Sequence, residues 1–533
     1  MFFLKDFKKI ENLIFLFLFL IIFISSIDIK RQFITEIYTE YDDVGVITLH
    51  KGVVGNKEIN ILEKKITLNQ TKLKDLNNSL LFPAYIVYGW TYAPGQYLVV
   101  PFLNLKNKNY EDKIFNVRII SLISTILNSL LILFISIKYF NVNKWLSLLI
   151  FCIFSFSYNS NIYANHMSPY ATYSLCSTLG AYICIQGLKS KNYLKYYTIN
   201  SMLIYFSYIN ILFFLAFIFI EFRMHRLKKT LLNLITDKKK YLIINFLLLI
   251  PIVSIILIKL IIFNAGDRGV YVDENLNYFF LLKRIAEQFS LSINSLHTGF
   301  IPVFFESINF ILILFIIICG IFYSYKKLNL NNKIILEIFV LYFVLWIFLY
   351  CFKKLPLDQT RHSLIYFPIY LFCLVLIFKN IKYSNIISII IILTLLIPGI
   401  KNNKKILESK KSNFEYDLIL NTQIKNIYTF SDTLSPFIYF DQNYKIFNLD
   451  LNSYRKNFKQ ENLPDKIILV SQNQSLEERS NYDTFFKNFI DFYNIDILKE
   501  NFSSTYMPFN NYKDHSTQNG FYLYKLDKKI SIY

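Results

Sequence analysis

Long apolar runs constrain this chain more than any other feature of its sequence. Hydrophobic residues make up 54% of its 533 positions, a larger share than ordinary soluble domains carry. The clearest runs have almost no charge and approach the roughly 20 residues with which a helix crosses about 30 Å of hydrocarbon. So many runs exclude a single secretory signal, and the chain is predicted to be a polytopic α-helical membrane protein. The runs cover Leu13–Ile27, Ile119–Ile137, Tyr241–Phe263, Ser307–Tyr323, Ile334–Tyr350 and Ile386–Ile397.

The basic residues predict how the spans are oriented. Lys5, Lys8 and Lys9 precede the first run. Because Lys and Arg are enriched at cytoplasmic span ends, we expect a cytoplasmic N-terminus. The first run lacks a small-residue cleavage site before Asp28, so it is expected to remain as an uncleaved helix.

The stretch 196–222 is ambiguous by hydrophobicity alone. As one helix it would place the basic segment 223–240 on the outer face, against the charge bias of membrane proteins. Ser207, Tyr208 and Asn210 interrupt the stretch, so we predict two short helices with an outer turn near Asn210. That hairpin gives about eleven spans. They lie at roughly 13–27, 117–137, 144–158, 168–187, 196–208, 211–222, 241–263, 303–323, 333–351, 363–379 and 384–400.

The sequence divides into two predicted domains. Residues 1–400 hold the spans and three outward loops, at about 28–112, 264–300 and 352–362. After Gly399, charged and Asn-rich segments surround short alternating or apolar runs, so residues 401–533 are expected to form a small extracytoplasmic α/β domain. Its predicted strands lie near 427–430, 436–440, 466–471 and 521–524, with a helix at 484–492.

Net charge and cysteine usage exclude several classes of site. The formal net charge is +20, but the basic residues gather at span ends, where they set topology and contact anionic lipid. No nucleic-acid partner is therefore expected. The cysteines lie in or beside apolar segments without close-spaced pairs, which predicts neither a zinc site nor a disulfide framework.

Two adjacent carboxylates, Asp42 and Asp43, follow the first predicted span. Such a pair near a membrane surface can hold a divalent cation such as Mg²⁺ or Mn²⁺. Alternatively, one carboxylate can accept the proton of an attacking hydroxyl. The alternative is a solvated acidic loop without a chemical role. The position of the pair in the first outer loop favours a catalytic or cation-binding site.

Other short motifs stand at the outer ends of the predicted spans. The segment 88–98 reads YGWTYAPGQYL, Arg118 leads into the second span, and the segment 163–171, YANHMSPYA, opens the fourth. With the acidic pair, these motifs make the first 400 residues resemble the GT-C glycosyltransferases. The resemblance is to relatives of protein O-mannosyltransferases and of the lipid A aminoarabinose transferase, which are similar to glycosyltransferase family 39.

The resemblance has departures that leave subfamily, acceptor and metal use open. Asp43 stands where the family commonly has Glu, and Tyr92 and Gly95 stand near an expected His and second Pro. His166 replaces an Arg at the start of the fourth span. The acidic pair and the general layout agree with the family.

The segment 358–368, DQTRHSLIYFP, opens a late span and resembles a helix start at which the same superfamily binds the carrier phosphate. A guanidinium such as that of Arg361, with His362 beside it, can form several hydrogen bonds to phosphate oxygens and stabilise a leaving group. Contact of both side chains with lipid headgroups is the alternative. Further substrate-binding candidates are Trp90, Tyr92, Tyr97, His166 and His297, for which interfacial anchoring or solvation is the competing role.

The resemblance implies a glycosyltransferase that moves a sugar from a polyprenyl-phosphate carrier to a lipid, glycan or protein acceptor. It implies action at the outer face of a bacterial plasma membrane, with Asp42 or Asp43 as base and inversion at the anomeric carbon. Two other functions remain open. A flippase or transporter of lipid-linked glycans would bury ionisable residues along its spans. An O-antigen polymerase or ligase would carry its main outer loop late in the chain.

Overall fold

A computed structural model describes the chain in two compact units. The helical unit comprises residues 1–34, 56–104 and 116–403, and the C-terminal unit comprises 35–55, 105–115 and 404–533. Within these ranges the structure describes 2–31, 58–61, 64–67, 93, 110–165, 169–190, 193–223, 243–250, 320, 322–323, 325–351, 362–411, 422–429, 445–449, 455, 463–472, 475–503 and 520–529.

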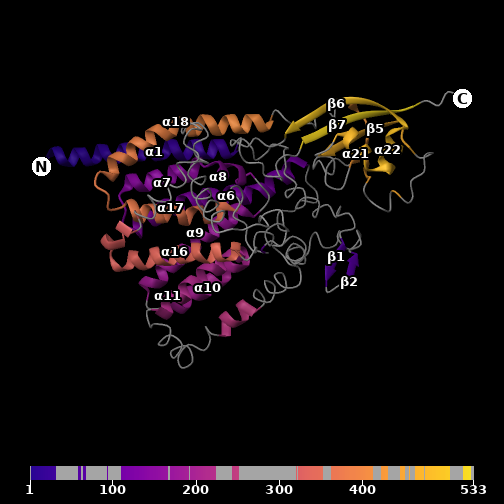
Figure 1. Cartoon of the computed structure of the whole chain (residues 1–533). Helices are drawn as coiled ribbons and strands as arrows, with labels where there is room; N and C mark the ends of the chain where they lie inside the picture. Colours follow the sequence, from indigo (N-terminus) through magenta and orange to yellow (C-terminus); the bar gives the residue numbers. More distant parts are fainter. Residues whose placement is uncertain are drawn as a thin grey trace. The chain divides into compact units, whose positions relative to one another are not determined.

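The helical unit contains long apolar helices that lie alongside one another (Figure 1). Among the described residues, four helices are long and apolar enough to cross a membrane, over Ile10–Arg31, Arg118–Lys138, Leu330–Cys351 and Ser384–Lys401. The predicted helical class is therefore confirmed, and these helices could span a membrane. The count of about eleven spans stays a prediction. The elements are α1 Phe2–Arg31, α6 Tyr110–Lys138, α7 Lys144–Phe156, α8 Tyr158–Tyr163, α9 Tyr170–Lys189, α10 Tyr193–Phe206, η3 Tyr208–Asn210, α11 Ile211–Arg223, α16 Leu330–Cys351, α17 Ser363–Phe378 and α18 Ser384–Lys411; β1 Glu58–Ile61 and β2 Lys64–Thr67 form a separate hairpin.

The stretch 196–222 forms two helices, as the positive charge of the following segment predicted. α10 ends at Phe206, and η3 leads directly into α11. The ring of Tyr197, early in α10, lies 4.9 Å from that of Phe217, late in α11, so the two helices are antiparallel. The predicted helical hairpin is therefore confirmed. Asn210 at the turn donates a hydrogen bond of 2.8 Å to the carbonyl of Cys176 in α9.

Small and polar side chains join the central helices, as is usual where helices pack without water. Asn128 of α6 donates to the hydroxyl of Ser174 on α9 at 2.8 Å, and Ser174 donates to the carbonyl of Leu364 on α17 at 2.7 Å. Close approach of α9 to α11 depends on Gly180, where a Cβ would meet the ring of Phe213 at 2.9 Å.

These contacts set the direction of each helix. Ser124, midway along α6, lies 3.3 Å from Thr172 near the start of α9, and Tyr139, just after α6, lies 3.3 Å from Tyr182 later in α9. The two helices therefore run the same way. Lys379, just after α17, donates at 2.6 Å to the carbonyl of Phe140, just after α6, so α17 shares that direction. We call the end where α9 and α17 begin the His362 end, and the opposite end the Lys379 end.

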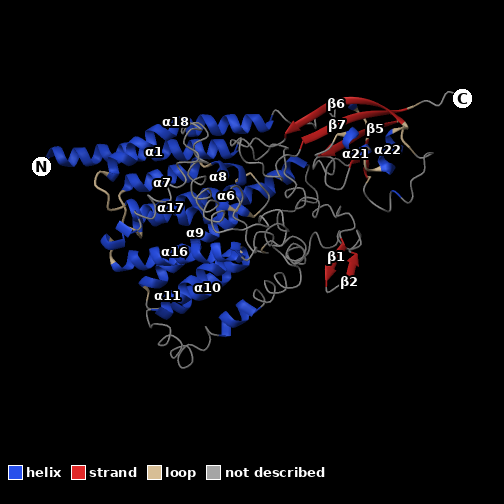
Figure 2. Cartoon of the chain, in the orientation of Figure 1, coloured by secondary structure: helices blue, strands red, loops and turns tan. Residues whose placement is uncertain are grey.

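The C-terminal unit is a mixed sheet with two short helices (Figure 2). The strand order is β4-β3-β5-β7-β6; β3 pairs parallel with β4 and β5, whereas β7 pairs antiparallel with β5 and β6. Apolar side chains of α21 and α22, including Phe486 and Phe489, form a core with Tyr428 and Leu469 of the sheet. The elements are β3 Asn426–Thr429, β4 Lys445–Asn448, β5 Lys466–Gln472, α21 Leu476–Ser480, α22 Thr484–Ile490, β6 Tyr493–Ser503 and β7 Gly520–Lys528.

This sheet agrees with the small α/β domain expected after the spans. Three of the predicted strands correspond to β3, β5 and β7, and the predicted helix corresponds to α22. The predicted strand at 436–440 lies outside the described residues. β4 and β6 were not predicted. β4 is only four residues long, whereas the alternation of Tyr493, Ile495 and Ile497 with polar residues at the start of β6 was a strand signal that the sequence analysis missed.

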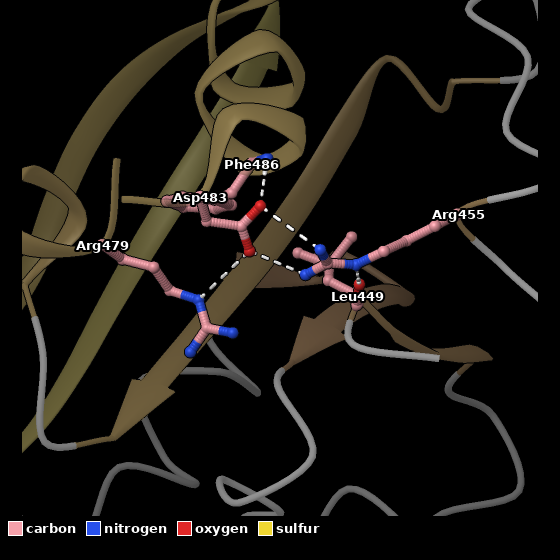
Figure 3. Close-up of polar contacts among 5 residues, drawn as sticks. All are labelled: Leu449, Arg455, Arg479, Asp483 and Phe486. Carbon is pink, nitrogen blue, oxygen red and sulfur yellow. Dashed lines mark hydrogen bonds and ion pairs between the residues drawn. The ribbon is translucent and has the colours of Figure 1, made fainter. Parts of the chain in front are cut away.

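One carboxylate ties together several parts of the C-terminal unit. Asp483 accepts hydrogen bonds from the guanidinium of Arg455 at 2.7 and 3.3 Å, and lies 3.9 Å from Nε of Arg479 (Figure 3). It also accepts the backbone N–H of Phe486 at 3.1 Å, as the N-cap of α22. Arg455 in turn donates to the carbonyl of Leu449, just after β4. Asp483 therefore links α22 to the segment after β4.

Replacing Asp483 by alanine is expected to destabilise the C-terminal unit by about 2 to 3 kcal/mol, because a helix cap and a charge-assisted pair are lost together. The unfolding of the sheet, followed by near-UV circular dichroism in denaturant, measures the loss. Asp496→Ala is the matched control, since Asp496 is exposed and pairs with a single cation among the described residues, Lys525 at 3.6 Å. The hydrogen bond that Lys525 donates to Asp527 raises the pKa of Lys525, so that lysine stays charged and paired. Equal losses in both variants would contradict a linking role for Asp483.

Candidate functional site

Most of the predicted site residues lie outside the described residues. This holds for the carboxylate pair Asp42 and Asp43, for Arg361, and for the binding candidates Trp90, Tyr92, Tyr97, His166 and His297. His362 is described. The site is therefore built from His362 and from the described residues of the motifs that surround the others.

His362 immediately precedes α17 and packs against the first residue of α9. Its ring lies 5.4 Å from that of Tyr170, with the planes at 80°. Tyr170 belongs to the motif 163–171 and is buried, and its ring lies 5.5 Å from that of Tyr163 at the other side of the same motif. Two segments that the sequence singled out, 163–171 and 358–368, thus meet at the His362 end.

A third motif reaches the same place through the backbone of Ala93. This fully buried residue stands in the segment 88–98, and its N–H donates to the hydroxyl of Tyr173 at 2.7 Å. The ring of Tyr173 lies 6.3 Å from that of Tyr170, edge to face. Tyr163, Tyr170, Tyr173 and His362 therefore form one aromatic cluster, and the backbone N–H of Ala93, from the first predicted outer loop, is hydrogen-bonded to it.

Arg118, at the start of the second candidate span, is buried with only 2% of its surface exposed. Arg118 lies about 1.7 turns before Ser124, which is within hydrogen-bond distance of Thr172 of α9. This position places the arginine toward the His362 end of α6. A cation held away from water inside a membrane helix bundle is costly and usually serves a function. Arg118 thus adds a buried positive charge at this end of the helical unit.

The structure adds a polar cluster that sequence reasoning missed. The ammonium of Lys30, at the end of α1, is fully buried and donates to three oxygens at 2.7 Å each: the hydroxyl of Ser26, the carbonyl of Ser155 and the side-chain carbonyl of Asn161. Ser155 lies in the last turn of α7, whose carbonyls have no partners within the helix. Lys30 therefore caps α7 and ties α1 to α8.

Two signals in the sequence point to this cluster. Ser26 and Lys30 are four residues apart and share one face of a helix, and Lys30 follows an apolar run without an acidic residue four positions away. The predicted first span ends at Ile27, which places Lys30 in the first outer loop. A lysine in such a loop is expected to be solvated. Only packing of α1 against α7 and α8 shows that the helix continues through it.

The polar cluster and the aromatic cluster are connected along one short segment. Asn161, which accepts from Lys30, and Tyr163, which contacts Tyr170, are two residues apart around α8. Asn165 donates to the carbonyl of Asn161 at 2.8 Å. Its own side-chain carbonyl is buried and accepts no hydrogen bond in the part of the chain that the structure describes. That oxygen can accept a hydrogen bond from a hydroxyl group of a ligand.

The arrangement suits an anionic, hydroxyl-rich ligand. His362 is partly exposed and an imidazole can donate to phosphate oxygens, and Asn165 offers an acceptor, while the buried rings of Tyr163 and Tyr170 pack behind the imidazole. Among the described residues, no group of three or more His, Cys, Asp or Glu side chains is placed to hold a metal ion. A Mg²⁺ or Mn²⁺ ion at Asp42 and Asp43 stays a prediction. Comparison with known protein families, curated proteins and solved structures gives no match for this chain.

Proposed function

We propose that this chain is a membrane glycosyltransferase that transfers a sugar from a polyprenyl-phosphate donor to a lipid, glycan or protein acceptor. The observation that carries the proposal is the meeting of Ala93, Tyr170 and His362 at one end of the helical unit. Each comes from a different motif by which the sequence resembles the GT-C glycosyltransferases. Their proximity is what a shared donor site would require.

The proposed reaction needs a cationic clamp and one base. The donor phosphate lies against His362 and Arg361, whose hydrogen bonds stabilise the charge that develops as the polyprenyl phosphate departs. Asp42 or Asp43 removes the proton of the acceptor hydroxyl, which attacks the anomeric carbon from the opposite side and inverts it. A divalent cation held by the pair would instead assist departure of the phosphate.

The proposed setting is a bacterial plasma membrane, with the N-terminus in the cytoplasm and the His362 end at the outer face. Exposed lysines at the Lys379 end, such as Lys138 and Lys189, support this orientation because cytoplasmic span ends are enriched in Lys and Arg. The C-terminal unit is then extracytoplasmic.

A glycan transporter is the second candidate, because Lys30 and Arg118 are cations buried at one end of the helical unit. Lys30, however, is held by three oxygens of two neighbouring helices and its own helix. That arrangement fits a fixed structural role better than a moving gate.

One experiment separates the two candidates. The purified chain is reconstituted in liposomes with polyprenyl-phosphate hexoses or pentoses labelled in the sugar, and an envelope extract supplies acceptors. A transferase moves the label into an acceptor and releases polyprenyl phosphate. Protection of the label from an external glycosidase, with the donor bond intact, would instead identify a transporter.

A further inference from the structure

A second cluster of charge and aromatic rings lies at the Lys379 end, far along the helices from the proposed donor site. The ammonium groups of Lys138 and Lys189 lie 5.9 and 4.8 Å from the centre of the Tyr139 ring. The two lysines come from different helices, since Lys138 ends α6 and Lys189 ends α9. The hydroxyls of Tyr139 and Tyr182 are 3.3 Å apart. We call these four residues the Tyr139 cluster.

The positive charge of the Tyr139 cluster is not compensated. Neither Lys138 nor Lys189 forms an ion pair with a carboxylate among the described residues, and both side chains are exposed. Lys144, at the same end of the unit, provides the contrast because its ammonium lies 3.1 Å from Glu11. Helix C-termini and the aromatic ring attract each lysine separately, but they do not offset the repulsion between two ammonium groups.

An anion between the lysines would remove that repulsion, and the surroundings indicate which anion. The phenol hydroxyls of Tyr139 and Tyr182 can donate to phosphate oxygens. On α6, Ile137 next to Lys138 and Phe134 one turn earlier are exposed, with 39% and 42% of their surfaces uncovered. The Lys138 ammonium lies 5.1 Å from the Phe134 ring. Polar donors at the end of a candidate span, next to an exposed apolar face, match a headgroup phosphate followed by acyl chains.

We propose that the Tyr139 cluster binds the phosphate of an anionic phospholipid at the Lys379 end of the helical unit. The lipid phosphate lies between Lys138 and Lys189, and the acyl chains cover Phe134 and Ile137. This binding is independent of sugar transfer. It selects a lipid by charge, because a zwitterionic headgroup brings its own cation into the site.

Lipid retention by the full-length chain tests the proposal. The protein in detergent is titrated with phosphatidylglycerol or phosphatidylcholine, and bound lipids are counted by native mass spectrometry. We expect phosphatidylglycerol to bind in preference to phosphatidylcholine. The variant with Lys138→Ala and Lys189→Ala should bind phosphatidylglycerol about 25-fold more weakly, with each lysine contributing about five-fold.

Three further samples complete the design. Lys144→Ala, which removes a lysine already paired with Glu11, should weaken binding less than two-fold. Lys138→Arg with Lys189→Arg keeps both charges and should bind as the unchanged protein does, which excludes misfolding as the cause of a loss. Soluble glycerol phosphate should not displace the lipid, because it lacks acyl chains. Equal loss in the Lys144→Ala variant, no loss in the double alanine variant, displacement by glycerol phosphate, or equal binding of both lipids would each overturn the proposal.

Discussion

Replacing Lys30 by methionine is expected to lower the free energy of unfolding by about 2 kcal/mol, because the Ser155 carbonyl and the Asn161 side chain each lose a hydrogen bond of 2.7 Å from the ammonium. Methionine preserves most of the volume of the side chain but cannot donate to the Ser155 carbonyl or the Asn161 side chain. The Ser155 carbonyl keeps only the longer bond from the Ser26 hydroxyl, at 3.3 Å, and removal of the buried ammonium offsets part of the lost hydrogen-bond energy. The substitution is still expected to be destabilising, because the Lys30 ammonium donates three hydrogen bonds of 2.7 Å in the folded protein.

The cysteines of the helical unit provide the measurement. Cys152 on α7 and Cys176 and Cys184 on α9 are buried, so a thiol-reactive fluorophore reports unfolding as the protein is heated in detergent. We expect the labelling transition of Lys30→Met to move to lower temperature.

The matched control for Lys30→Met is Lys144→Met. Lys144 joins the same two helices, α1 and α7, through Asn12 and Glu11 at the Lys379 end. It is partly exposed, so its loss should cost less than about 1 kcal/mol. A Lys30→Met protein that unfolds at the same temperature as the Lys144→Met protein would show that the buried cluster contributes no stability of its own.

Replacing Asp42 or Asp43 by asparagine is expected to reduce sugar transfer by about 10² to 10⁴-fold at whichever position supplies the base. Asparagine has nearly the same shape, yet it cannot accept the proton of the acceptor hydroxyl and binds divalent cations poorly. Turnover is measured with purified protein as release of polyprenyl phosphate from a labelled donor.

The controls distinguish a base from a metal ligand. Added Mn²⁺ or Mg²⁺ should partly restore a variant that has lost only metal affinity and should not restore one that has lost the base. Asp273→Asn, in the second predicted outer loop, should leave turnover unchanged. Full turnover in both Asp42→Asn and Asp43→Asn would remove the carboxylate pair from the mechanism.

The spans were predictable because their signals are local. Apolar length predicted α16 and α17 to within a few residues of Leu330–Cys351 and Ser363–Phe378. The positive charges at 223–240 resolved the α10–α11 hairpin, which hydrophobicity alone would have merged into one helix. Both signals depend on a few neighbouring residues and the thickness of the bilayer, so no tertiary contact was needed to interpret them.

Helix ends were predicted less well, for a physical reason. The last predicted span closes at residue 400, whereas α18 continues to Lys411 through Lys, Asn and Glu residues. An apolar run reports where hydrocarbon ends, and charged residues with good helix propensity can extend a helix beyond it. For the same reason α1 begins at Phe2 and α6 at Tyr110, ahead of their apolar runs.

The sequence by itself determined that this chain has helices apolar enough to cross a membrane and where its hairpin turns, because these properties follow from local hydrophobicity and charge. Only the tertiary structure decided that Ala93, Tyr170 and His362 meet, that Lys30 caps α7, and that β7 separates β5 from β6. Such contacts join residues up to hundreds of positions apart. Their partners are selected by packing and by the need to satisfy every buried polar group, which no local pattern records.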